Sequence, residues 1–324
     1  MTPPETTTSP SSRSNLDPAP PQPSSGLNPT QIGFLYLLGV DVVWGLYPVL
    51  ATDLVSRQDP YFVAGVSALT AGLPVVIFLV MSGRLSRVVG AQAGPGVRMR
   101  LVLVALSATV MSSLFFFTGA ARTSGLNASL LSQVEPVYSI VLAALFLRER
   151  ISLQQLGATA LLLAGAVAVM WKGGLQFQTG DVLVVLTPFW YQVGHLIAKR
   201  LYADIVHPYA IPAVRMTLGG AILLCIAFIR RPELVWLLTD LSVMGPLVAF
   251  GLGVVATEKL CWYAALQRVP LAQASAMLVP SVGVGVLASW LLLGQSPVGT
   301  QWLGFVLLLI GLGALAREGL RSSA

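Results

Sequence analysis

The chain has 324 residues, of which 55% are hydrophobic and only 10% charged, and its formal net charge is +6. A soluble domain carries about 25% charged residues, so this composition excludes an ordinary soluble protein and indicates a polytopic membrane protein. Basic residues form no cluster long enough to bind nucleic acid. The two cysteines, Cys225 and Cys261, lie in apolar runs and are read as small buried hydrophobic residues, so we expect no disulfide, metal or cofactor.

Residues 1–30 differ from the rest of the chain. They are rich in Pro, Thr and Ser, contain one basic residue (Arg13) and have no apolar run. Such a segment cannot bury enough apolar surface to fold, so we expect a disordered tail. It lacks the hydrophobic region of a signal peptide and is too poor in Arg for a transit peptide.

Ten apolar runs follow, each close to the roughly 20 residues that a membrane-spanning helix needs. Connections as short as Arg122–Gly125 make neighbouring spans antiparallel. The predicted fold is therefore an all-α polytopic membrane protein with ten transmembrane helices. The predicted spans are 31–52, 60–81, 101–120, 126–147, 153–171, 181–198, 208–229, 243–266, 270–293 and 300–316.

An internal repeat divides these spans into two halves. Residues 59–67 read DPYFVAGVS, and residues 207–215 read HPYAIPAVR, 148 positions later. Pro136 is echoed in the same way by Pro280. Each half (31–172 and 181–316, followed by a short tail at 317–324) holds five spans. Five is odd, so the second half crosses the membrane in the opposite sense, and inverted repeats of this kind are typical of secondary transporters.

The distribution of Lys and Arg predicts the orientation. With the N-terminus in the cytoplasm, inside segments carry twelve basic residues and outside segments five. Cytoplasmic loops are the ones enriched in Lys and Arg. We therefore expect a multi-pass protein of the cell (inner) membrane with both termini cytoplasmic, and the same tally favours ten spans over nine or eleven.

Short motifs in both halves carry a family likeness. The first half contains NASLL (127–131), EPV (135–137), AALFLRERIS (143–152), QLG (155–157) and AGA (164–166). The second half contains AQASA (272–276), Pro280, LLLGQ (291–295), QWLG (301–304) and Gly311. Together they resemble the EamA-type repeat of the drug/metabolite transporter superfamily over residues 31–316. The resemblance implies two inverted five-helix repeats that export or exchange small organic solutes by alternating access.

The chain departs from this family pattern at several positions. The Glu that follows the fourth span is present as Glu149, but its second-half counterpart is Gln295. The Arg often seen in the second span is replaced by Ser67, while the seventh span keeps Arg215. The two halves are therefore electrically unequal. Glu149, between Arg148 and Arg150, is read as a structural latch at the cytoplasmic turn.

Four ionisable residues within the spans are candidate substrate or coupling-ion sites: Glu135, Asp41, Arg215 and Glu258. An ionisable side chain in a span costs several kcal/mol unless it is paired or hydrated, so each is a functional candidate. Asp41 lies about 15 Å into the first span and Glu135 about 14 Å into the fourth, near the midplane. Glu135 is the leading candidate because it precedes Pro136, and a carboxyl group in a partly dry cavity can exchange protons near neutral pH or bind a cationic group.

Each of these candidates also has a structural alternative. Arg215 could bind a substrate carboxylate or phosphate through its planar fork, or it could neutralise Glu135 or Asp41. Asp41 could be a hydrogen-bonded core residue. Glu258 and Lys259 are adjacent and point about 100° apart on a helix, so we expect one to line the transport path and the other to pair with a neighbouring helix.

Aromatic and small residues complete the candidate path. Trp44 and Trp190 occupy matched positions in the two halves and could form an aromatic lining, with core packing as the alternative. Asn127 begins a glycosylation sequon, but one very close to the membrane. Further polar groups that could face the cavity are Gln133, Gln192 and His195. Small-residue packing faces are predicted at the pairs Gly251/Gly253, Gly283/Gly285 and Gly311/Gly313.

The function that these features favour is a secondary active transporter of a small organic solute, namely an amino acid, metabolite or drug. Its partners would be that solute and the lipid bilayer, with protons as a further hypothesis. Whether the chain forms a homodimer is left open by the sequence. An uncoupled facilitator or exchanger is one alternative. An intramembrane enzyme or sensor is another, but the chain has no His/Cys/carboxylate cluster with metal spacing and no soluble signalling domain.

Overall fold

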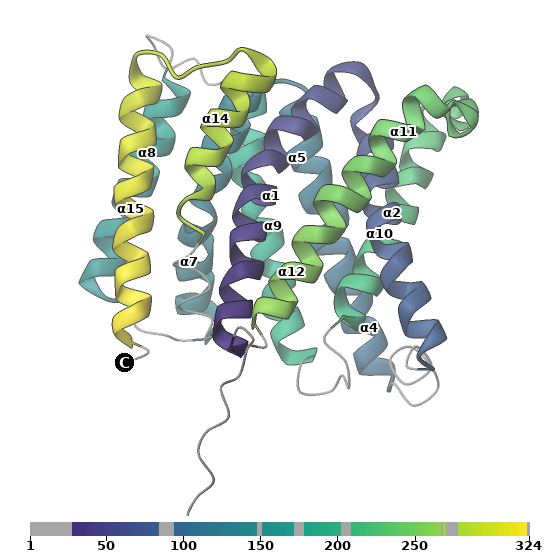
Figure 1. Ribbon diagram of the computed structural model, residues 1–324, viewed down its shortest axis with the longest axis horizontal. Helices are drawn as coiled ribbons and strands as arrows, with labels where there is room; N and C mark the ends of the chain where they lie inside the picture. Colours follow the sequence, from purple (N-terminus) through teal and green to yellow (C-terminus); the bar gives the residue numbers. More distant parts are fainter. Residues whose placement is uncertain are drawn as a thin grey trace, which may run out of the picture.

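The computed structural model describes residues 28–83, 94–147, 151–171, 178–201, 209–266, 268–269 and 278–322. Over these ranges the regular structure is helical, and the helices stand side by side in one bundle (Figure 1). The predicted latch at 148–150 and residues 1–27 of the predicted N-terminal tail lie outside the described residues. The expectation of an all-α membrane protein is confirmed.

The first half contains five span-forming segments. The first, second and fifth segments are single helices, namely α1 (Pro29–Arg57), α2 (Pro60–Met81) and α8 (Leu153–Met170). The third is the continuous series α4 (Pro95–Ala105), η1 (Leu106–Met111) and α5 (Ser112–Ala120). The fourth is the series α6 (Gly125–Leu131), η2 (Ser132–Val134) and α7 (Glu135–Leu147).

The second half repeats this plan. It begins with α9 (Thr179–Leu201) and α10 (Ala210–Arg230), followed by the 3₁₀ helix η3 (Pro232–Thr239). The next span is the series α11 (Leu241–Phe250), η4 (Gly251–Ala256) and α12 (Thr257–Leu266). The last two helices are α14 (Ser281–Leu293) and α15 (Thr300–Ser322).

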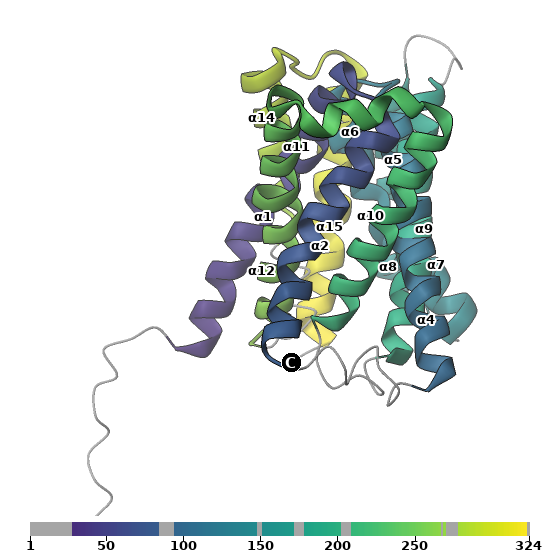
Figure 2. The ribbon, with the colours of Figure 1, turned by 90° about the vertical axis from the view of Figure 1, so that its right-hand side faces the viewer.

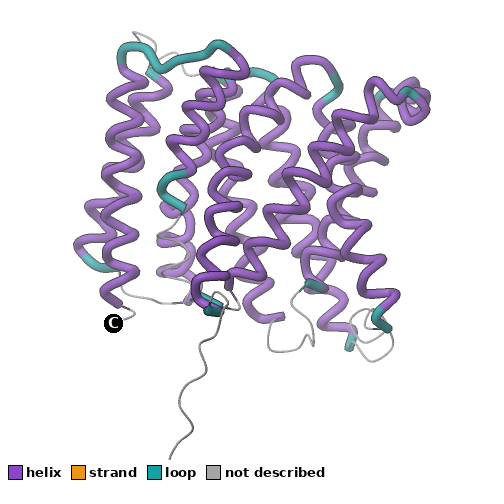
Figure 3. The backbone as a smooth tube through the Cα atoms, viewed as in Figure 1, coloured by secondary structure: helices purple, strands orange, loops and turns teal. Residues whose placement is uncertain are grey.

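Nine of the described helical segments are long and apolar enough to cross a membrane, and α14 is a shorter apolar helix. It forms the second part of the predicted ninth span, whose residues 270–277 lie outside the described ranges. Ahead of α14 the chain makes a turn at 278–280, which lies partway along the bundle and not at its end (Figure 3). The start of α1 and the end of α15 lie at the same end of the bundle (Figure 1), as an even number of crossings requires.

Local sequence explains where several helices begin. Asn28 and Gln31 form a capping box ahead of α1, with Pro29 in the first turn. Asp59 accepts hydrogen bonds from two backbone N–H groups at the start of α2, directly before Pro60. Such residues satisfy the orphan N–H groups of a first turn, and proline there loses no helical hydrogen bond.

Equivalent helices of the two halves pack against each other. α2 lies along α10 and α8 lies along α15, while α1 contacts α12 and α14, and α9 contacts α5 and α7. The turned view shows helices of both halves interleaved (Figure 2). The halves are therefore interlocked in one membrane domain.

Close approach of these helices depends on glycine. A methyl group added at Gly65 would lie 2.8 Å from the backbone nitrogen of Leu224, and one at Gly220 would lie 2.6 Å from that of Leu69. In lipid, such tight van der Waals packing replaces the hydrophobic effect as the force that holds helices together. In each of the three predicted glycine pairs, one member (Gly251, Gly285 or Gly311) contacts a neighbouring helix, and the other has no such neighbour within 4 Å of an added methyl group.

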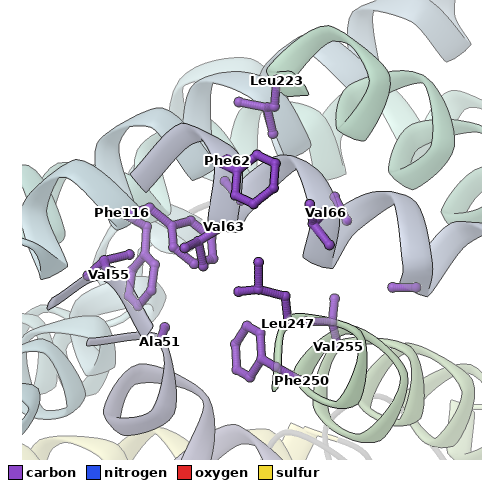
Figure 4. Packing of buried hydrophobic residues seen from close by; sticks show 14 of the residues in the cluster. Ala51, Val55, Phe62, Val63, Val66, Phe116, Leu223, Leu247, Phe250 and Val255 are labelled. Atoms are coloured by element: carbon purple, nitrogen blue, oxygen red, sulfur yellow. The ribbon is translucent and has the colours of Figure 1, made fainter. Parts of the chain in front are cut away.

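A large apolar core joins the halves. Phe62 on α2, Phe116 on α5, Leu223 on α10 and Phe250 on α11 are all at least 96% buried within it (Figure 4). The core also contains Ala51 and Val55 of α1. It fixes the relative positions of five helices around the cavity described below.

Two short π-helical segments occupy equivalent places in the third and eighth spans. These are η1 and η4, each six residues long and each in the middle of its span. The sequence analysis did not predict them. A π-helical turn widens the helix locally and often marks a functional site.

Candidate functional site

A cavity of about 120 Å³ lies between helices of both halves. This is well above the ~10–15 Å³ that one water molecule needs, so it has room for a small organic molecule. Its polar and charged lining residues are Tyr47, Ser67, Thr109, Ser112, Ser113, Ser132, Glu135, Thr187, Tyr191, Arg215, Glu258 and Lys259, and its apolar wall includes Trp44, Phe116, Phe117, Met216 and Val255.

Glu135 lines this cavity and lies directly after a 3₁₀ turn in the fourth span. The 3₁₀ turn η2 ends α6, and Glu135 and Pro136 open the first turn of α7. The Glu135 carboxylate accepts a hydrogen bond from Nε2 of Gln192 at 2.7 Å, which links α7 to α9.

A cationic centre faces the same cavity and consists of Tyr191, Arg215 and Lys259. The hydroxyl oxygen of Tyr191 accepts a hydrogen bond from Nη2 of Arg215 at 3.0 Å and another from Nζ of Lys259. Cζ of Arg215 lies 5.0 Å from the centroid of the Tyr191 ring, and Nζ of Lys259 lies 4.9 Å from it. Both distances are within the range of a cation–π interaction. Helices α9, α10 and α12 meet at this centre, which is called the Tyr191 centre below.

Glu258 and Lys259 both line the cavity and form an ion pair, with 2.6 Å between Oε2 and Nζ. The expectation that only one of them would line the path is therefore wrong. Both residues lie in the first turn of α12, and both side chains are long enough to converge despite the angle between their Cα–Cβ bonds. The cavity thus holds two cationic and two acidic residues.

The two predicted tryptophans behave differently. Trp44 lines the cavity and packs edge-on against Trp262, with ring centroids 6.3 Å apart. Trp190 is not part of the lining and packs against Phe115 and Phe189, at 6.0 Å and 5.3 Å between centroids. On α9 it is Tyr191, turned about 100° from Trp190, that faces the cavity.

The other predicted polar residues are not among those that line the cavity. Asp41 does not line it and is buried against the start of α14, with 3% of its surface exposed. Gln192 donates a hydrogen bond to Glu135, and the His195 ring packs edge-on against Tyr191 with 4.7 Å between ring centroids. Gln133 is buried on η2.

Asn127, the first residue of the sequon, belongs to a buried polar cluster. It is 1% exposed, donates a hydrogen bond to Oδ1 of Asp181 at 3.1 Å and accepts one from Nε2 of Gln301 at 2.7 Å. Thr123 also donates to Asp181. Burial excludes a glycan in this conformation, and the cluster instead ties α6, α9 and α15 together.

The hydroxyl groups of the lining were not foreseen. Ser67 and Ser112 donate to backbone carbonyls four residues earlier, at 2.7 Å each. Ser and Thr do this commonly in membrane helices, so nothing in the sequence separates the cavity-lining ones from the others. Ser67 stands where the resemblance leads one to expect Arg, and Lys259 supplies a second cation to the cavity.

The sequence model of the EamA-like transporter family matches residues 31–171 and 178–317, which is most of the chain. The chain belongs to this family. It is therefore a multi-pass membrane transporter and not an enzyme, as the family resemblance predicted.

The chain is similar to other proteins at 26–28% identity. An uncharacterized transporter of Methanothermobacter thermautotrophicus is 26% identical over 214 residues, which are 61% of this chain and 61% of that protein. A probable amino-acid metabolite efflux pump of Escherichia coli (strain K12) is 28% identical over 303 residues, covering 86% of this chain and 93% of that protein. A solved crystal structure superposes with a TM-score of 0.62 at 19% identity and covers 91% of this chain and 99% of its own, which shows a shared fold.

Proposed function

We propose that this EamA-family protein exports small amino-acid-type metabolites across the cytoplasmic membrane by alternating access, using the cavity as its substrate site. The observation that carries the proposal is the presence of both signs of charge in one small cavity. A zwitterion presents a carboxylate and an ammonium group, and each finds its complement there. The amino-acid class and the outward direction are also supported by the printed name of the Escherichia coli relative.

The Tyr191 centre is the proposed carboxylate subsite. Arg215 presents a planar fork that can bind a carboxylate through two parallel hydrogen bonds, and Lys259 adds a second positive charge. The hydroxyl of Tyr191 holds both side chains on the cavity side. A substrate carboxylate would join or replace the hydroxyl oxygen as the acceptor of these hydrogen bonds.

Glu135 and Glu258 are the proposed ammonium subsite. Both line the cavity, and Glu135 is oriented by Gln192. Trp44, Phe116 and Met216 form an apolar wall for the substrate side chain. Since a charged group left unpaired in a dry site is costly, the cavity would discriminate against molecules that lack either charge.

Alternating access would use the breaks in the spans. The fourth span is interrupted at η2, the ninth at 278–280, and the third and eighth contain π-helical turns. Broken helices at the repeat interface are typical of transporter sites near the membrane midplane. Opening at the end that holds the Asn127–Asp181–Gln301 cluster would require its hydrogen bonds to break. The excess of basic residues in inside segments supports cytoplasmic termini, which would make this the outer end.

Counterflow into liposomes tests the proposal. Vesicles containing purified protein and unlabelled amino acids are supplied with labelled amino acids, and uptake of label is measured. Wild type is expected to take up label, and Arg215→Gln to lose at least about tenfold, the effect of ~1.4 kcal/mol in substrate binding. Arg57→Gln is the matched control because Arg57 is exposed and pairs with Asp53 one turn earlier on the same helix. Unchanged uptake by Arg215→Gln would contradict the assigned subsite.

A second measurement uses wild type alone. Competitors that share one side chain but carry both charges, only the ammonium group, or only the carboxylate are compared in the counterflow assay. Only the zwitterion is expected to compete well. Equal competition by the amine alone would favour a transporter of organic cations instead.

A further inference from the structure

Asp41 is a buried acidic residue outside the cavity. It lies in the middle of α1, is 3% exposed, and neither of its carboxylate oxygens has a hydrogen-bond partner among the described residues. The backbone N–H of Ser281, at the start of α14, faces it but already donates to the carbonyl oxygen of Leu278 at 3.2 Å. An acid held in this way needs an explanation that packing alone does not give.

The surroundings of Asp41 are closely packed. One turn further along α1, a methyl group added at Gly45 would lie 2.6 Å from Cβ of Val284 and 2.7 Å from the carbonyl oxygen of Ser281. Ser129 of α6 faces Gly285 of α14, and its hydroxyl is also buried without a hydrogen-bond partner in the described part of the chain. Helices α1, α6 and α14 therefore meet in near backbone contact, and this meeting point is called the Asp41 junction.

No counter-charge reaches Asp41 from the described elements that pack on α1. Helices α6 and α14 contain no ionisable residue, and α5, α11 and η4 contain none either. On α2 the titratable residue is Tyr61. Helix α12 brings Glu258 and Lys259, which pair with each other at the cavity, together with Cys261 and Tyr263. An ionised carboxylate buried without a partner costs several kcal/mol, whereas the neutral acid avoids this cost.

We propose that Asp41 is a proton-binding site separate from the substrate cavity, and that the Asp41 junction closes only around the neutral acid. The carboxylate takes up one proton when α1 and α14 separate, and the proton is retained while they are packed. Trp44, three residues further along α1, lines the cavity, so movement of α1 at Asp41 is transmitted to the substrate site. This coupling role rests on the proposed transport function, whereas the proton site itself does not.

Infrared spectroscopy tests the site without any substrate. Full-length protein carrying aspartate labelled with ¹³C in the side-chain carboxyl group is placed in lipid nanodiscs at neutral pH. Wild type is expected to show the C=O stretch of a protonated aspartic acid, and Asp41→Asn is expected to lose it. Asp181→Asn is the control, because Asp181 is equally buried but accepts hydrogen bonds from Thr123 and Asn127; there the band should remain.

Three infrared results would overturn the proposed proton site at Asp41. Absence of the band from wild type, a measurement that needs no variant, would overturn the proposal, and so would its persistence in Asp41→Asn. A band that appears only when choline replaces sodium would assign the junction to a metal cation and also overturn it. Failure of amino-acid counterflow in wild type would contradict the proposed substrate class without changing the infrared result. Failure of the proposed function can therefore be distinguished from failure of the proposed proton site.

Discussion

Arg215 donates a hydrogen bond from Nη2 to the hydroxyl oxygen of Tyr191 at 3.0 Å, joining two helices of the second half at the wall of the cavity. Arg215 is only 2% exposed, and its guanidinium also lies against the Tyr191 ring. Because Lys259 donates to the same oxygen, one phenol group positions two cations. This relationship makes Tyr191 the natural point at which to test the site.

Tyr191→Phe keeps the ring and removes the shared acceptor. We expect the KM for amino-acid transport to rise by roughly 10-fold or more, since a hydrogen bond to a charged group contributes about 1.5–3 kcal/mol. Counterflow at several substrate concentrations measures this. Tyr61→Phe is the control, because the Tyr61 ring under Arg230, 4.5 Å from its Cζ, is retained. An unchanged KM in Tyr191→Phe would remove this residue from the carboxylate subsite.

Glu135→Gln tests whether the acid at the start of α7 couples transport to protons. The amide oxygen of Gln can still accept the hydrogen bond from Gln192, so the protein is expected to fold. Without a titratable group, pH-driven transport should be abolished, as followed by a pH dye inside the vesicles. Glu233→Gln, on the exposed helix η3, should behave as wild type. Normal pH-driven transport by Glu135→Gln across the neutral range would refute coupling through this residue.

Gly45→Ala tests the contact between α1 and α14. The new methyl group would meet Val284 and the Ser281 carbonyl, and overpacking of this kind costs about 1–3 kcal/mol. The thermal midpoint of unfolding in detergent should fall. Gly39→Ala lies on the same helix with nothing within 4 Å of the new methyl group, and the better helix propensity of Ala should leave stability equal or up to about 1 kcal/mol higher. Equal midpoints for the two variants would show that the helices do not meet as described.

Asn127→Ala tests the polar cluster of Asn127, Asp181 and Gln301. It removes a donor to Asp181 and an acceptor from Gln301, and each buried group left unsatisfied costs about 1–3 kcal/mol. We expect a clear loss of thermal stability. Thr300→Ala removes only the exposed hydrogen bond to the Trp171 carbonyl and should have a much smaller effect. Comparable losses in both variants would mean that the cluster contributes little.

Much of the architecture could be read from local sequence. Apolar length predicts the spans, because the thickness of the bilayer sets how many residues a helix needs to cross it. The echo of residues 59–67 at 207–215 revealed the repeat, and the motifs around Glu135 and Pro136 led to the family. Among the candidate site residues, four reach one cavity: Glu135, Arg215, Glu258 and Trp44.

Other features were decided only when the helices packed. Trp190 and Tyr191 are neighbours in sequence, yet only Tyr191 of the two faces the cavity. Lys259 lines the cavity together with Glu258, whereas Asp41 is buried outside it. In water, an apolar stripe shows which face of a helix is buried. In a membrane, lipid is as apolar as the protein interior, so all faces of a span are apolar and the pattern that would mark the inward face is lost. Composition, span length and the internal repeat therefore determined that this chain crosses the membrane in two related halves, and contacts between helices determined which side chains meet.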